Sequence, residues 1–274
     1  MFKNLSLKVI VFGFIFTFFS SFGQSFFLGI FNTSIRETLS ITHGQFGSIY
    51  ASATLCSSLL LIWVGKKIDD INIFRFAIYV KILLSFSCFF FSKISSIVFL
   101  FIAIFLMRFS GQGMMSHTAT TTVSRYFTKS RGRALSICWF GLSSAEFILP
   151  VLMVFLLSLT TWQNIWTVIA ILILIFLPIA SFFLVRTVKL DTRESTEGEE
   201  FKEENIKQWK RIEVIKDYKF YIVSMNMLAM PWIATGVFVY QSFITESKNW
   251  GPFVIAQSFM SYSVFSVITL LISG

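Results

Sequence analysis

Long apolar runs separated by short polar segments make up most of this chain. A helix crosses a bilayer core of about 30 Å with about 20 apolar residues, because its backbone polar groups must be hydrogen-bonded within the segment. Eight stretches meet this requirement, at Lys8–Phe31, Gly44–Val64, Phe74–Phe91, Ile97–Ala119, Ala134–Leu157, Trp162–Val185, Tyr218–Tyr240 and Phe253–Gly274. The pattern predicts an all-α membrane protein with eight transmembrane helices.

The distribution of positive charge indicates an orientation in the membrane. With the N-terminus in the cytoplasm, 18 of the 23 Lys and Arg residues lie inside and three lie outside. The opposite orientation would violate the positive-inside rule. We therefore expect an integral protein of the cell (inner) membrane with a cytoplasmic N-terminus. The basic residues lie in short segments between apolar runs, so the net charge of +9 does not predict a nucleic-acid partner.

Composition removes several other classes of protein. The chain is 55% hydrophobic and only 14% charged, whereas a soluble domain has about 25% charged residues. Its three cysteines each lie in an apolar run without a partner at metal-ligand spacing, so we expect neither a disulfide framework nor a metal site. No nucleophile, base and orienting acid have a suggestive spacing. We expect no enzyme activity and no cofactor.

One segment, residues 186–217, is strongly polar and holds nine of the 14 acids. We interpret it as a cytoplasmic central loop between two parts of the chain. Phe201, Trp209 and Ile212 share one face at helical spacing, which favours an amphipathic helix on the inner leaflet. A solvated linker is an equally good interpretation.

The two parts show an internal repeat. A shift of 209 residues pairs identical residues at Ile35/Ile244, Glu37/Glu246, Ser52/Ser261, Ser57/Ser266, Leu61/Leu270 and Gly65/Gly274. The same shift pairs Asn32 with Gln241 and Thr38 with Ser247. We interpret the last two helices as a second copy of the first two.

Two motifs connect the chain with a known family. The second helix is followed by Gly65-Lys66-Lys67-Ile68-Asp69-Asp70-Ile71-Asn72-Ile73-Phe74-Arg75, and the fourth helix and its exit contain Arg108-Phe109-Ser110-Gly111-Gln112-Gly113 and Arg131-Gly132-Arg133-Ala134. The first resembles, in Gly65 and Asp69, the loop signature of the major facilitator superfamily. The second resembles that family's Arg with spaced glycines and its Arg-Gly-Arg-Ala-like start of the fifth helix.

The resemblance implies a fold of twelve helices in two bundles. Residues 1–185 would form the N-terminal six-helix bundle, and residues 218–274 would be the first two helices of a C-terminal bundle. We expect the sequence to be a fragment on this basis. The fifth helix departs from the antiporter signature at Ala145 and Glu146, so antiport gains no support. The pattern looks most like monocarboxylate or oxalate/formate carriers.

Polar residues inside the predicted helices suggest a site. A charge at the bilayer centre costs about 2.5–3.5 kcal/mol or more, so Arg108 and Glu146 are expected to have a structural or functional role. We expect Arg108, Gln24, Gln112 and Asn226 to bind solute and Glu146 to couple transport to protons. A structural Arg108–Glu146 ion pair is the alternative. Lys81 is expected to reach the inner surface by its long stem.

We further expect a gate at the cytoplasmic ends of the helices, where Asp69 meets Arg131 or Arg133 beside Gly65. A glycine permits close helix approach and a carboxylate can accept bonds from a basic partner. An ordinary charged turn is the alternative.

Together these features predict a secondary carrier that moves a small solute by alternating access, as a proton-coupled symporter of an organic anion such as a carboxylate. The alternatives are a membrane receptor or assembly subunit without transport, and a carrier of a cationic or neutral solute.

Overall fold

The computed structural model describes residues 2–127, 129–186, 211–251 and 253–273, and its regular elements there are helices. In chain order they are α1 (Phe2–Ser20), η1 (Ser21–Gly23), α2 (Ser25–Ile30), α3 (Asn32–Leu39), α4 (His43–Val64), η2 (Gly65–Ile68), α5 (Ile73–Phe91), α6 (Ile97–Met107), η3 (Arg108–Met115), α7 (Ser116–Tyr126), α8 (Arg131–Leu157), α9 (Trp162–Val185), α10 (Arg211–Lys216), α11 (Tyr218–Val239), α12 (Gln241–Ser247) and α13 (Phe253–Ser273). Within the described ranges, eight helical segments are long and apolar enough to cross a membrane. The expected all-α membrane fold with eight spans is confirmed.

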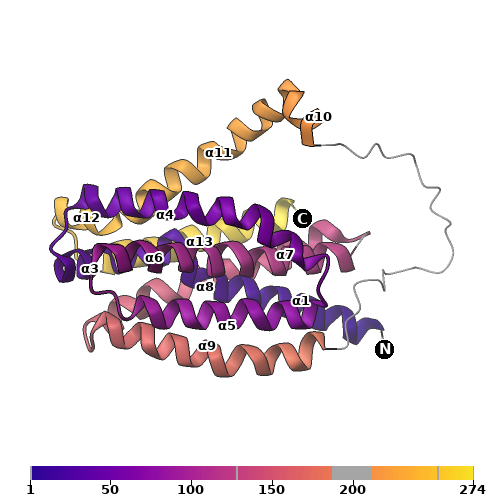
Figure 1. The fold of residues 1–274 in the computed structure, drawn as a ribbon, viewed down its shortest axis with the longest axis horizontal. Helices are drawn as coiled ribbons and strands as arrows, with labels where there is room; N and C mark the ends of the chain where they lie inside the picture. The colour runs from indigo at the N-terminus through magenta and orange to yellow at the C-terminus, as the bar shows by residue number, and fades with distance from the viewer. Residues whose placement is uncertain (1, 128, 187–210, 252, 274) are drawn as a thin grey trace.

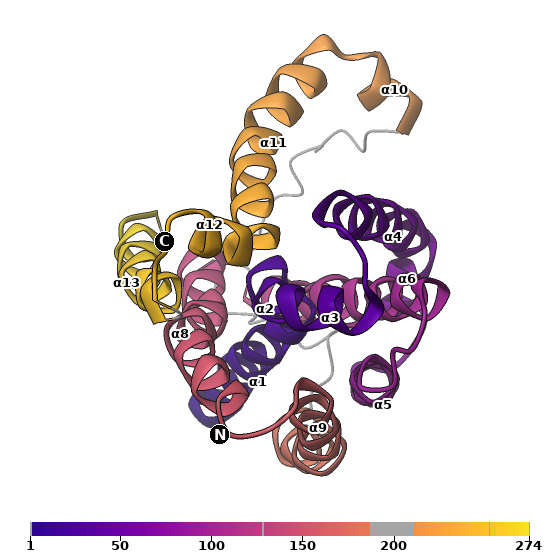
Figure 2. The same ribbon diagram turned by 90° about the vertical axis from the view of Figure 1, so that its left-hand side faces the viewer.

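The helices lie side by side in an elongated bundle (Figure 1), and the view along the bundle shows how they are arranged around α1 and α2 (Figure 2). α1 packs along α8, α5 along α9, and α4 against α6 and η3. A core of aromatic rings surrounds Trp166, whose ring contacts those of Phe27, Phe31 and Phe91. These contacts hold the first, third and sixth spans together.

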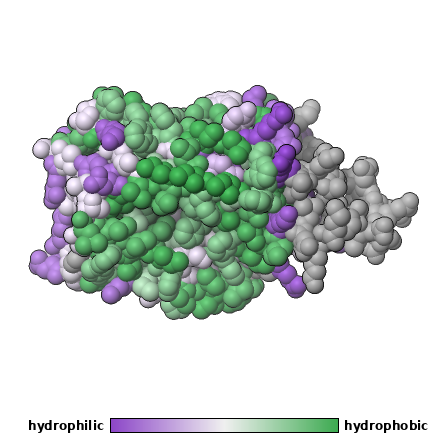
Figure 3. Space-filling model, turned by 90° about the horizontal axis from the view of Figure 1, so that it is seen from below, coloured by the Kyte–Doolittle hydropathy of each residue, from purple (hydrophilic) through white to green (hydrophobic). Residues whose placement is uncertain are grey.

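A broad apolar area covers the face shown in Figure 3, with hydrophilic residues gathered toward the two ends. Large apolar side chains such as Leu55, Phe86 and Ile175 are exposed elsewhere along the spans or on this face. Such a surface would be unfavourable in water, but it matches the hydrocarbon core of a bilayer.

The last two spans pack differently from each other. α13 lies along α8, whereas α11 touches α2 near its C-terminal end and then tilts away from the other helices toward α10 (Figures 1 and 2). We call the end of the bundle that carries α3 and α12 the far end, and the opposite end, where η2 and the start of α8 lie, the near end. Phe201 and Trp209 of the proposed amphipathic helix fall outside the described residues.

The backbone repeats with the offset that the sequence predicts. α2 ends at Ile30 and α11 at Val239, and α3 and α12 begin at Asn32 and Gln241, so both boundaries are 209 residues apart. Each pair of helices is therefore broken at the same place. These two boundaries agree with the interpretation of the last two spans as a second copy of the first two, which stays a prediction.

The fourth span is longer than expected. α7 continues to Tyr126, beyond the expected end at Ala119. Polar residues are accommodated there because the hydroxyl groups of Thr118 and Thr122 donate to carbonyl groups one turn earlier in the same helix, at 2.6 Å each.

Candidate functional site

Arg108 is the buried charge around which the candidate site is built. It begins η3, a π-helical stretch inserted between α6 and α7, and such stretches are frequent at functional sites. Its side chain is only 5% exposed. Its Nη1 donates to the carbonyl oxygen of Gly23 at 3.0 Å and to Oγ of Ser25 at 3.3 Å. Arg108 therefore reaches from the fourth span to the first.

The first span is broken where Arg108 meets it. Between α1 and α2, Gln24 has extended backbone angles, φ −81° and ψ 153°, so the helical hydrogen-bond ladder is interrupted. This break makes the Gly23 carbonyl available to Arg108. A Cβ atom on Gly111 would lie 2.6 Å from the Gly23 nitrogen, so these two glycines allow the backbones to touch.

Tyr50 and Ser25 complete the surroundings of Arg108, and we did not predict either residue. The Tyr50 hydroxyl donates to Oγ of Ser25 at 3.0 Å, and the Arg108 guanidinium carbon lies 5.4 Å from the centre of the Tyr50 ring. This is a cation–π distance. Ser25 faces Arg108 because the helix is broken between α1 and α2. Gly23 is the only turn-forming residue in the sequence at this break, so the break was not predicted.

Arg108 has no carboxylate partner in the described part of the chain. The ion pairs found there involve other residues, and the Arg108 Nε–H is buried without a hydrogen-bond acceptor. The expected pairing of Arg108 with Glu146 is therefore not made in this structure. A guanidinium with unused donors in a buried site can bind an anion.

Glu146 lies instead on the seam between α8 and α13. It is 6% exposed, and no described residue forms a hydrogen bond or an ion pair with it. Nearby on the same seam, the Ser263 hydroxyl donates to the carbonyl of Ser143, and Oγ of Ser143 lies 3.1 Å from Oγ of Ser266. Glu146 is thus placed between the fifth span and the eighth span rather than beside Arg108.

The three amide side chains predicted for the site divide into two groups. Gln24 and Gln112 are half-buried where the first span crosses η3, next to the contact of Gly23 with Gly111. Asn226 is exposed on the tilted part of α11 and donates to Ile222 of its own helix at 2.9 Å. The structure brings Gln24 and Gln112 toward Arg108 but leaves Asn226 apart.

The near end carries an ion pair with a different partner from the one expected. The Asp69 carboxylate accepts a hydrogen bond from Arg125, not from Arg131 or Arg133. Arg125 has this position because α7 continues as a helix past the expected end of the span. Arg131 and Arg133 are exposed at the start of α8.

Gly65 also contacts the fourth span. Its carbonyl oxygen lies 2.9 Å from Nε2 of His117, and a Cβ atom on Gly65 would lie 3.4 Å from the same nitrogen. The end of α4 is therefore joined to α7 at two places, one at Gly65 and one at Asp69. Both contacts link helices of the first part of the chain, and the gate stays a prediction.

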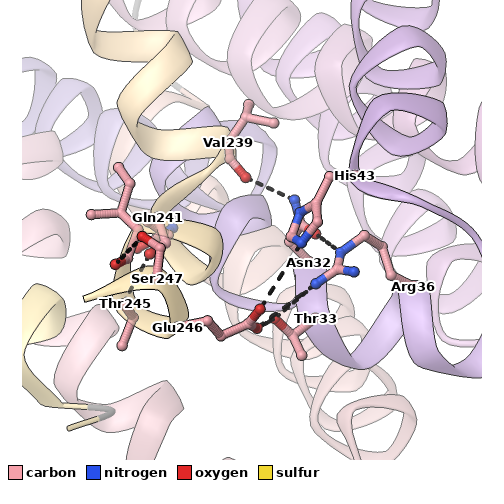
Figure 4. Close-up of polar contacts among 10 residues, drawn as sticks. Asn32, Thr33, Arg36, His43, Val239, Gln241, Thr245, Glu246 and Ser247 are labelled. Carbon is pink, nitrogen blue, oxygen red and sulfur yellow. Dashed lines mark hydrogen bonds and ion pairs between the residues drawn. The ribbon is translucent and has the colours of Figure 1, made fainter. Parts of the chain in front are cut away.

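The far end contains a polar cluster between α3 and α12 (Figure 4). Oγ1 of Thr33 donates to Oε1 of Glu246 at 2.8 Å. Arg36 Nη2 lies 3.8 Å from the same oxygen, and His43 Nε2 lies 3.9 Å from Oε2. Arg36 is held in place because its Nε donates to Oδ1 of Asn32 at 2.7 Å.

Two amide side chains cross the same interface in opposite directions. Nδ2 of Asn32 donates to the carbonyl of Val239 at 2.7 Å (Figure 4). Nε2 of Gln241 donates to the carbonyl of Phe26 at 2.8 Å. Asn32 reaches the last residue of α11, and Gln241 reaches the first turn of α2. These bonds and the Thr33–Glu246 bond join the first span to the seventh span and α12 at the far end.

A pocket at the far end does not coincide with Arg108. It has a volume of about 690 Å³ and lies between α2, α3, α8, α12 and α13. Among its described lining residues Glu246 alone is charged, and its charge is balanced in part by Arg36. We place the candidate site at Arg108 because a buried charge without a counter-ion needs a ligand more than a neutralised pocket does.

Lys81 is buried rather than close to the surface as expected. It is 1% exposed, and its Nζ donates to the carbonyl of Leu177 at 3.0 Å. Its ammonium group also lies 5.9 Å from the ring of Phe16. Lys81 therefore joins α5 to α9 and α1 and takes no part in the candidate site.

The family model described as Major Facilitator Superfamily matches residues 13–274 of the chain. A search of curated proteins found no match.

Proposed function

Because the chain belongs to the Major Facilitator Superfamily, whose members are secondary transporters of small solutes, we propose that it moves a small organic anion by alternating access between two helical bundles. Residues 1–185 would form one bundle and residues 218–274 the beginning of the other. Arg108 would bind the anion, and Glu146 would carry the coupling proton in a symport mechanism. The chain would lie in the cell (inner) membrane with its N-terminus in the cytoplasm.

The observation that carries this proposal is the state of Arg108. It is a buried cation without a described carboxylate partner, and its Nε–H has no acceptor. A carboxylate would supply both the missing charge and the missing acceptor through a two-bond contact with the guanidinium fork. Binding would therefore remove the free-energy cost of a buried, unpaired guanidinium and of its unsatisfied Nε–H donor.

The separation of Arg108 from Glu146 suggests how coupling would operate. Glu146 lies on the α8–α13 seam, which would join residues 1–185 to the second bundle and would have to change when access alternates. A carboxylate there would exchange a proton with water when the seam opens and would be shielded from water when it closes. The proton would thus move with the change in access.

A carrier of a cationic or neutral solute is the second candidate. The pocket of about 690 Å³ at the far end favours it, because Glu246 is the only charged residue in its lining and polar groups such as Thr33, Ser242 and Asn249 surround it. A membrane receptor that binds solute without moving it is the third candidate.

Uptake into proteoliposomes would separate these candidates. Labelled carboxylates, sugars, amino acids and organic cations are offered to the wild type, Arg108→Lys, Arg108→Gln and the control Arg75→Gln, which changes an exposed residue. We expect uptake of a carboxylate that scales with vesicle volume. Arg108→Lys should weaken its affinity about 10-fold or more, because the charge remains but the fork is lost.

Two results would contradict the proposal. One is unchanged affinity for an anion in Arg108→Gln, and the other is a cationic substrate. Saturable binding that does not depend on vesicle volume would identify a receptor instead of a carrier.

A further inference from the structure

At the far end, α2 and α3 pack against α11 and α12 across an approximate two-fold axis, and one contact locates that axis. Gly29 and Phe238 are 209 residues apart and therefore equivalent in the repeat, and a Cβ atom on Gly29 would lie 2.0 Å from the Phe238 carbonyl oxygen. In a two-fold interface, a residue next to the axis meets its own equivalent. The axis that relates α2 and α3 to α11 and α12 thus passes between Gly29 and Phe238.

Every contact around such an axis has an equivalent in which the two copies exchange roles. The crossing amides follow this rule in kind, because Asn32 and Gln241 are equivalent residues and each donates to a carbonyl of the other copy. They differ in position. Asn32 reaches Val239, which is equivalent to Ile30, but Gln241 reaches Phe26, one helical turn earlier.

The bond between Thr33 and Glu246 should have an equivalent as well. A shift of 209 residues converts Thr33 into Ser242 and relates Glu246 to Glu37, so the second pair again consists of a hydroxyl donor and a glutamate. The chemistry of the bond is therefore present twice, but in this structure only the Thr33–Glu246 bond is made.

Both members of the second pair are unused. Oγ of Ser242 is buried and has no hydrogen-bond partner among the residues described, which is unusual for a buried polar group. Glu37 is exposed, and its carboxylate forms no ion pair with a described residue. On one side of the axis the Thr33–Glu246 hydrogen bond is formed. On the other side the equivalent bond between Ser242 and Glu37 is not formed.

We infer that Ser242 is the docking position of Glu37, and that the far end closes fully when the Ser242 hydroxyl donates to the Glu37 carboxylate. Glu37 and Ser242 are then positioning residues for alternating access, and the present structure is a closed state with one of two latches engaged. This inference rests on the alternating-access part of the proposed function and is independent of the solute.

Disulfide trapping tests the geometry. In a full chain with Cys56, Cys88 and Cys138 replaced by Ser, Glu37→Cys with Ser242→Cys is oxidised in proteoliposomes without added solute. Thr33→Cys with Glu246→Cys is the positive control. Thr38→Cys with Ser242→Cys is the negative control, since the Thr38 hydroxyl oxygen accepts from Trp162 at 3.4 Å. We expect the test pair to cross-link at least half as completely as the positive control.

A double-mutant cycle tests the energetics. Glu37→Gln, Ser242→Ala and the double variant are made with Ala256→Cys, a buried pocket residue whose labelling by maleimide reports opening of the far end. Each single change should speed labelling several-fold, and the double variant should label no faster than the faster single variant. Cross-linking no better than the Thr38 pair, or fully multiplicative effects in the cycle, would overturn the inference. Neither cross-linking nor labelling measures transport, so the inference about Glu37 and Ser242 can fail or succeed independently of the anion-uptake experiment.

Discussion

Ser40 and Asn249 adopt the same left-handed backbone conformation, with φ 53° and φ 52°, and they lie 209 residues apart. Among the described residues they are the non-glycine positions with positive φ. Each follows a short helix at the far end, α3 or α12, and precedes the next span. An uncommon conformation repeated at equivalent positions indicates that the two copies share their turn geometry as well as their helices.

The contact between Gly23 and Gly111 predicts a steric test of the fold. Gly111→Ala would place a Cβ atom against the Gly23 backbone and force apart the first and fourth spans. We expect a loss of about 1–3 kcal/mol in stability, as for other overpacked sites. Gly236→Ala is the matched control because nothing lies within 4 Å of its added Cβ atom. Thermal stability in detergent would measure both, and equal stability would show that the backbones are not in contact.

Tyr50 predicts a graded effect on solute affinity. Tyr50→Phe keeps the ring over Arg108 but removes the donor to Ser25, so affinity should fall about 2- to 10-fold, the equivalent of one hydrogen bond. Tyr50→Leu also removes the ring and should bind more weakly still. The control is Tyr79→Phe, which changes an exposed tyrosine. Identical binding in Tyr50→Phe and Tyr79→Phe would remove Tyr50 from the site.

The Asp69–Arg125 pair predicts a defect in turnover. Both side chains are about half exposed, so the pair should contribute only about 0.2–1 kcal/mol, or at most a five-fold change in a conformational equilibrium. Asp69→Asn and Arg125→Gln should slow transport to a similar extent without changing solute binding, and the double variant should be no slower than either. Asp70→Asn should behave as wild type. Loss of binding with normal turnover of bound solute would argue against a gate.

Glu146 predicts the pH dependence of transport. Glu146→Gln keeps the shape of the side chain but cannot exchange a proton, so uptake should no longer respond to an imposed proton gradient while solute binding persists. Glu146→Asp keeps a titratable group and should retain part of the response. Measurements with and without a gradient at several pH values would decide. A normal response in Glu146→Gln would assign coupling to another residue.

The sequence predicts the helices and their repeat well, because span length, charge and turn positions are local properties. It also identifies Arg108 and Glu146 as buried charges, since few other ionisable residues lie within apolar runs. Whether those two meet depends on which helices are neighbours. In the structure α8 faces α13 at Glu146, and no local pattern contains that information.

The length of one helix, a break in another and tertiary packing explain the remaining differences. Arg125 was missed as the partner of Asp69 because the fourth span continues further than its apolar pattern. The contact of Ser25 with Arg108 depends on a break in the first span that composition does not reveal. Lys81 was expected at the surface because a long stem permits it, but tertiary packing buried its ammonium group against the Leu177 carbonyl.

The Gly23 carbonyl, which accepts a hydrogen bond from Arg108, would compete with a bound solute for the same donor. Any solute that takes this donor must leave a backbone carbonyl without its partner, which costs about 1–3 kcal/mol in a buried position. A solute with a single weak acceptor gains too little to exceed this threshold, whereas a carboxylate offers two charged oxygens at once. In the proposed site the broken first helix would thus select among ligands, because weakly bound solutes would not displace the Gly23 carbonyl.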